Sequence, residues 1–118
     1  MKLNQLALWL MTVAVTAATP VAAQSLNPQD FPFLAGVNNQ LESKLQVSDE
    51  QKIEAGHSVC KQLQTGQTLG QLIAQESQAL ESQPLNLQYY IRRYNKAVKE
   101  YAIRNYCPEF SKQWKAWH

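Results

Sequence analysis

The chain has 118 residues, 45% of them hydrophobic and 17% charged, with a formal net charge of +2. A chain of this length builds one small domain and leaves no room for a second. Its small net charge lacks the broad positive field of a nucleic-acid-binding protein, so we expect no nucleic-acid partner.

Residues 1–23 have the three parts of a secretion signal. Lys2 supplies a positive charge, residues 6–15 form a run that is apolar except for Thr12, and small side chains lead up to Ala23. An uncleaved membrane anchor is the alternative, but a membrane span takes about 20 apolar residues and this run falls short. We therefore predict cleavage after Ala23 and a secreted or periplasmic protein.

Residues 24–32 are predicted to form an irregular lead-in, because two prolines lie within five positions of each other. From Phe33 onward, apolar residues recur at every fourth position, which predicts a first helix ending near 45–47. The helical domain is accordingly expected at 33–108, followed by a short aromatic and basic helix or tail at 109–118.

Two capping boxes open the second and third predicted helices. Ser48 with Gln51 begins a helix that is expected to end at Gly66, since glycine supplies the left-handed residue on which helices commonly stop. Thr68 with Gln71 begins the next helix. The positions that recur at helical spacing along these two helices are Ile53, Gly56, Val59, Cys60 and Leu63, then Leu69, Leu72, Ile73, Glu76, Ala79 and Leu80.

The fourth predicted helix follows a break at 82–84, with Asn86 as its expected N-cap. It ends at Cys107-Pro108, because a residue before proline avoids the helical conformation. Its core-facing positions are Leu87, Ile91, Tyr94, Val98, Tyr101 and Asn105, and its charged side carries Arg92, Arg93, Lys96, Lys99, Glu100 and Arg104. A last short helix over 108–117 completes an all-α bundle of four to five short helices.

Cys60 and Cys107 are predicted to form a disulfide, because two thiols in an oxidising compartment normally pair. The bond would clamp the second helix to the end of the fourth and contribute about 4 kcal/mol to stability. Gly56 lies inside the second helix, where glycine is unfavourable. This position indicates a closely packed neighbour, which we expect to be the fourth helix around 97–101.

Three chemical roles are the alternatives to a structural disulfide. His57, Cys60 and Cys107 could bind a metal, a cysteine and His57 could form a nucleophilic site, or the cysteines could exchange disulfides. The spacings typical of these sites, such as Cys-x-x-Cys, are absent. The motifs of hydrolases, phosphate-binding loops and zinc proteases are absent too. We therefore expect no metal, no cofactor and no enzymatic activity.

The C-terminal third of the chain gives the strongest indication of function. Residues 24–87 carry three basic and seven acidic side chains, whereas residues 88–118 carry seven basic and two acidic ones. The predicted interaction surface consists of Arg92, Arg93, Lys96, Lys99, Phe110, Trp114 and Trp117. An unnamed protein or envelope component is the expected partner of a monomeric chain, with peripheral contact to an anionic membrane surface as the alternative. A purely structural role for these aromatic and basic side chains remains the other interpretation.

Two cysteine-centred motifs resemble those of a known family. Residues 55–66 follow the pattern A-G-x-x-V-C-x-x-L-x-x-G, the fourth helix ends in Y-C-P at 106–108, and Phe33-Leu34 resembles an opening F-L element. The stretch 33–108 is thus similar to the domain of unknown function 732 family of short secreted bacterial proteins. The resemblance implies a compact helical domain with paired cysteines, and it implies no activity. The arginine-rich fourth helix and the Phe-Trp-Trp tail depart from the family pattern.

Overall fold

The structure is a computed structural model that describes residues 26–41 and 45–117, so the predicted leader at 1–23 lies outside the described residues. Five α-helices, one 3-10 turn and no strand are found within these ranges, which confirms the all-α prediction. The elements are α4 (Asp30–Gln40), α5 (Asp49–Gln64), α6 (Leu69–Leu80), α7 (Leu85–Asn105), η1 (Pro108–Phe110) and α8 (Ser111–Trp117).

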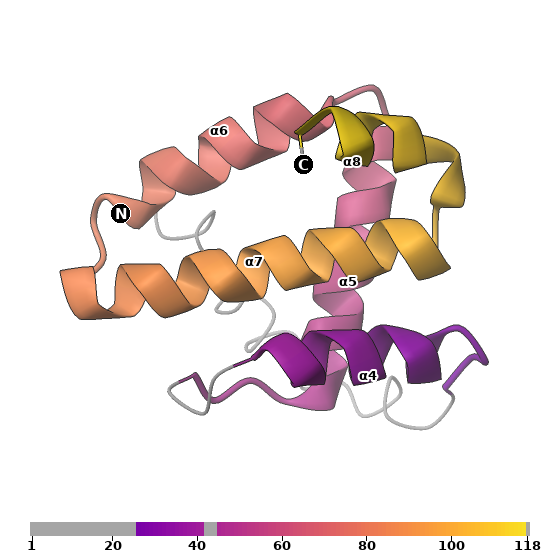
Figure 1. Cartoon of the computed structure of the whole chain (residues 1–118), viewed down its shortest axis with the longest axis horizontal. Helices are drawn as coiled ribbons and strands as arrows, with labels where there is room; N and C mark the ends of the chain where they lie inside the picture. The colour runs from indigo at the N-terminus through magenta and orange to yellow at the C-terminus, as the bar shows by residue number, and fades with distance from the viewer. Residues whose placement is uncertain (1–25, 42–44, 118) are drawn as a thin grey trace.

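The long helix α7 lies at the centre of the bundle (Figure 1). α4 runs along one side of α7, α6 and α8 lie on the other side, and α5 crosses α7 and contacts both α4 and α7. Among the helices that the structure describes, the most extensive contacts are those of α7 with α4 and with α5. The main core therefore lies between these three helices, while α6 packs more loosely on α7.

The first helix begins earlier and ends earlier than predicted. Its start at Asp30 is fixed by the side chain itself, because Asp30 Oδ2 accepts a hydrogen bond from the Asn27 backbone N–H (2.7 Å). The helix ends at Gln40, and the prediction that it extends to 45–47 is wrong. Leu45 and Val47 still pack against the core, but from non-helical backbone that leads into the next helix.

Both capping boxes are confirmed. Ser48 Oγ accepts from the Gln51 N–H (3.1 Å) and Gln51 Oε1 accepts from the Ser48 N–H (2.9 Å), and Thr68 and Gln71 form the same pair of bonds. Gly66 has a φ of +112°, so it is the left-handed residue after α5 as predicted. These signals are purely local, which is why the sequence alone reveals them.

The expected N-cap of α7 is wrong. The helix begins at Leu85, one residue before Asn86, with Pro84 in the N-cap position and no side-chain cap bond. The fixed φ of proline suits the entry to a helix, so Pro84 does not only break the preceding helix. The predicted last helix is present as η1 followed by α8.

The disulfide between Cys60 and Cys107 is formed, with an S–S distance of 2.04 Å, and it joins α5 to the chain just after α7. Gly56 does have a close neighbour, but the predicted one is wrong. A Cβ added there would come within 2.7 Å of the Phe33 ring and 3.0 Å of the Tyr106 ring. Aromatic rings from α4 and from the end of α7 therefore occupy the space that glycine leaves.

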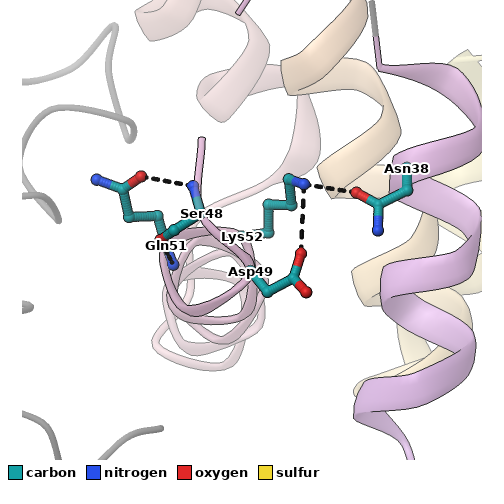
Figure 2. A network of polar contacts seen from close by, with 5 residues as sticks. All are labelled: Asn38, Ser48, Asp49, Gln51 and Lys52. Atoms are coloured by element: carbon teal, nitrogen blue, oxygen red, sulfur yellow. Dashed lines mark hydrogen bonds and ion pairs between the residues drawn. The ribbon is translucent and has the colours of Figure 1, made fainter. Parts of the chain in front are cut away.

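A polar contact also ties α4 to α5 (Figure 2). The buried Lys52 donates hydrogen bonds from Nζ to Asn38 Oδ1 (2.5 Å) and to Asp49 Oδ1 (3.4 Å). Both acceptors lie beside the lysine, and Asp49 remains largely exposed to solvent. The ammonium group of Lys52 thus has two hydrogen-bond acceptors at the edge of the core.

Candidate binding site

The predicted basic residues do not form one surface. Arg92 and Lys96 are exposed on α7 and Arg93 is half-buried, but Lys99 is only 3% exposed. The prediction that Lys99 belongs to the solvated basic side of the helix is therefore wrong. Its ammonium group is bonded to Glu76 of α6, so it lies between the two helices.

The aromatic tail folds back onto the bundle. Phe110 and Trp114 are half-buried and pack against the core, whereas Trp117 is 54% exposed. The Trp117 ring lies over Gly70 of α6, where an added Cβ would approach it to 2.7 Å. Gln113 of α8 also accepts a hydrogen bond from the first backbone N–H of α6 (2.8 Å). Two of the three predicted tail residues are therefore largely used in packing.

A cavity of about 210 Å³ lies between α6 and α7. The two helices diverge from their short connection, as Figure 1 shows. Ile73 and Leu80 of α6 give the cavity an apolar wall, and Arg92 and Lys96 of α7 line its exposed edge. Ligand pockets typically measure roughly 300–1,000 Å³. This cavity therefore suits one inserted side chain rather than a large ligand.

Three buried polar residues form the floor of the cavity: Glu76, Asn95 and Lys99. Lys99 Nζ donates to Glu76 Oε1 (2.5 Å) and to the backbone oxygen of Asn95 (2.9 Å). Burial raises the pKa of Glu76 and lowers the pKa of Lys99, and the attraction between the two groups opposes both shifts. The ion pair of Glu76 and Lys99 thus lies beside the apolar side chains that line the cavity.

Several polar atoms at this floor lack a hydrogen-bond partner. Glu76 Oε2 and both Oδ1 and Nδ2 of Asn95 are buried without a partner among the described residues. An unpaired buried polar group costs about 1–3 kcal/mol. The Tyr94 hydroxyl is also unpartnered within these residues, but Tyr94 lies in the core and does not line the cavity. Glu76 and Asn95 differ from Tyr94 in that both line the cavity, although these three atoms are themselves buried.

An exposed stripe of α7 leads along the helix to the mouth of the cavity. We call it the aromatic-basic stripe, and it consists of Leu85, Tyr89, Arg92 and Lys96. Leu85 is 82% exposed and Tyr89 is 55% exposed. Arg93 lies with its guanidinium 5.5 Å from the centre of the Tyr89 ring and donates to the Tyr89 hydroxyl (3.2 Å). The spacing i, i+4, i+7 and i+11 places the four stripe residues on one side of the helix.

A second polar cluster joins the start of α4, the middle of α5 and the end of α7. The Tyr106 hydroxyl donates to Asp30 Oδ1, and the His57 ring stacks on the Tyr106 ring with centroids 4.2 Å apart. Burial is the main reason that the pKa of Tyr106 is raised, and the bond to Asp30 adds to it. Both cysteine sulfurs are bonded to each other, and the described residues contain no group of three ligands able to hold a metal ion. This cluster serves to fasten α4 and α5 to the end of α7.

Neither Glu76 nor Asn95 is among the site residues predicted from the sequence. Glu76 does carry a signal, because it occupies an apolar position of its helix. A carboxylate at a buried position needs a cationic partner, and Lys99 supplies it. Asn95 carries no comparable signal, because an asparagine within a long helix is typical of an exposed position.

The fold defines a small all-α domain, in which the disulfide joins α5 to the chain just after α7. The chain belongs to a family described as "Protein of unknown function (DUF732)", whose profile matches residues 27–109. No curated protein and no solved structure matches the chain. Among the described residues, no helix has both the length and the apolar character needed to cross a bilayer.

Proposed function

We propose that this protein is an exported, non-enzymatic binding module that docks an acidic segment of a partner protein on the aromatic-basic stripe. The observation that carries the proposal is the cavity at the end of this stripe. It combines the apolar side chains of Ile73 and Leu80 with the exposed cations Arg92 and Lys96 on one helix face. Such convergence of a few polar groups in an apolar cavity is typical of a binding site.

The dimensions of the stripe support a short peptide as the docked element. Leu85 and Lys96 are eleven residues apart on one helix, which corresponds to about 16 Å at 1.5 Å per residue. An extended peptide covers that length with about five residues. Arg92 and Lys96 would then pair with carboxylates, while Leu85 and Tyr89 provide apolar contact at the other end.

Export is supported by the leader pattern at 1–23 and by the disulfide, since such bonds persist in oxidising compartments. The competing role at a membrane surface has weaker support. It relies on the aromatic tail, and Phe110 and Trp114 pack against the core, so that Trp117 alone of the three is well exposed.

The test uses an N-acetylated glutamate hexapeptide titrated into the oxidised protein in low-salt buffer, followed by calorimetry. The double variant Arg92→Glu/Lys96→Glu is expected to weaken binding at least tenfold, because it replaces two attractive charges with repulsive ones. Lys61→Glu/Lys112→Glu is the matched control, since it makes the same change in net charge at exposed sites on α5 and α8. An equal loss in both variants, or no binding by the unaltered protein, contradicts the proposal.

A further inference from the structure

The accessible lining of the cavity between α6 and α7 comes from four side chains. Ile73 and Ser77 of α6 are half-buried, and Arg92 and Lys96 of α7 are exposed. The other lining residues are all buried: Glu76, Leu80, Asn95 and Lys99. A group that enters the cavity would therefore contact the first four side chains and not the buried ion pair.

Much of this accessible lining is hydrocarbon, although two of the four side chains are charged. Ile73 is apolar, and arginine and lysine carry three or four methylene groups below their charged ends. The stems of Arg92 and Lys96 thus provide apolar contact on the α7 side, as Ile73 does on the α6 side. Since an apolar cavity of about 150 Å³ can hold a benzene ring, the volume of about 210 Å³ has room for one aromatic ring.

The arginines of α7 show a preference for aromatic rings. The guanidinium of Arg93 lies 5.5 Å from the centre of the Tyr89 ring, and that of Arg104 lies 5.1 Å from the centre of the Tyr101 ring. Arg92 has no ring, hydrogen-bond or ion-pair partner among the described residues. A guanidinium attracts the face of a ring, and its N–H edge can pair with a carboxylate at the same time.

Charge and shape together restrict the occupant. A cationic side chain would be repelled by Arg92 and Lys96, whereas acidic neighbours of the occupant would be attracted to them. An aliphatic side chain would gain apolar contact but no attraction to the two cations. We infer that the cavity receives an aromatic side chain, such as phenylalanine, carried within the acidic segment. This inference rests on the proposed function, because the acidic residues bring the ring to the cavity.

The experiment compares three N-acetylated hexapeptides that differ only at the third of six positions. Five residues are glutamate, and the variable residue is phenylalanine, cyclohexylalanine or glutamate. Cyclohexylalanine has nearly the shape of phenylalanine but lacks the aromatic face. In calorimetric titration of the oxidised protein, the phenylalanine peptide is expected to bind at least tenfold tighter than the glutamate peptide, because the ring leaves water. It should bind about threefold tighter than the cyclohexylalanine peptide, because the cations attract the ring face.

A cavity-filling variant and its control locate the ring. Ser77→Trp is expected to remove the preference for phenylalanine over glutamate and to leave the affinity for the glutamate peptide within about twofold, because Arg92 and Lys96 are unchanged. Gln78→Trp, at the next and exposed position of α6, should keep the full preference. Isotope-filtered NMR of the unaltered protein locates the ring without any substitution, and it should show NOEs between the phenyl protons and the Ile73 methyl groups.

Equal affinity for the phenylalanine and glutamate peptides overturns the aromatic inference, while the proposed function survives because the glutamate peptide still binds. Binding of the cyclohexylalanine peptide as tightly as the phenylalanine peptide also overturns it, since the cavity would then accept any apolar side chain of that size. Absence of NOEs to Ile73 in the saturated complex places the ring elsewhere and has the same consequence. Failure of all three peptides to bind contradicts both proposals.

Discussion

Two lysines are buried among the described residues, and the two regions around them differ. Lys52 lies between α4 and α5, and its ammonium group donates hydrogen bonds to Asn38 and Asp49 at the edge of the core (Figure 2). Lys99 lies between α6 and α7, where its partner Glu76 keeps one carboxylate oxygen unpartnered among the described residues. The polar contacts of the first region therefore have a structural role. The second region contains buried polar atoms that have no partner among the described residues, and it adjoins the cavity.

The same contrast extends to packing. The α4–α5–α7 region holds the disulfide and two glycine positions filled by aromatic rings, with Tyr101 over Gly36 and Phe33 against Gly56. α6 contacts α7 less extensively and adjoins a cavity. Close packing on one side and a cavity on the other is the arrangement expected of a scaffold that presents a binding site.

The largest effect should come from the disulfide that holds the packed region together. Replacing Cys60 and Cys107 with serine or alanine is expected to lower the free energy of unfolding by about 4 kcal/mol, because the bond closes a long loop in the unfolded chain. Urea denaturation of the variant and the oxidised protein measures this difference. A loss below about 1 kcal/mol would show that packing alone fixes α5 against the end of α7.

The next largest effect concerns the ion pair at the cavity floor. Lys99→Met leaves the buried Glu76 without its counter-charge and is expected to cost about 3 kcal/mol in unfolding free energy. The double variant Lys99→Met/Glu76→Leu should recover most of that loss, because no buried charge remains. Urea denaturation of both variants checks the pair, and a double variant as unstable as Lys99→Met would contradict the account.

Two asparagines of α7 sharpen the comparison between satisfied and unsatisfied groups. Asn95→Leu is expected to raise the free energy of unfolding by about 1 kcal/mol, because it removes unpaired buried atoms. Asn105→Leu should lower it by about 1 kcal/mol, because the Asn105 side chain donates to the Tyr101 backbone oxygen (2.8 Å). Chemical denaturation of both variants gives the signs. Destabilisation by Asn95→Leu would show instead that the Asn95 side chain contributes to the stability of the fold.

The smallest effect is expected at the C-terminal tail. Tryptophan emission should change little when vesicles containing phosphatidylserine are added, because Trp114 is packed and Trp117 already lies over Gly70. A blue shift that salt reverses would instead favour the membrane-surface role. Trp117→Ala then tells whether this residue reports the contact.

Local signals predict much of this fold from the sequence. The capping boxes at Ser48 and Thr68, the left-handed Gly66 and the disulfide all depend on neighbouring residues or on compartment. The end of α4 could not be predicted in this way, because apolar spacing continues through Leu45 although the backbone does not remain helical. Pattern alone does not separate a helix from a packed loop.

The site was less predictable because its parts meet only in three dimensions. Arg92 and Lys96 are found on the exposed side as the pattern indicates, but Lys99 is drawn inward by Glu76 of another helix. The neighbours of Gly56 likewise come from distant segments of the chain. The cavity depends on how far α6 diverges from α7, and no residue pattern within either helix specifies that divergence.

The measurement that tests the central claim most directly is a titration of the ¹⁵N-labelled oxidised protein with the N-acetylated glutamate hexapeptide, observed by NMR. We expect saturable shifts of the backbone amides around Tyr89, Arg92 and Lys96, which lie on the exposed stripe. The amide signals of Asn38, on the opposite side of α7, should stay in place. Shifts that avoid the stripe, or that spread evenly over the surface, would contradict the proposed binding site.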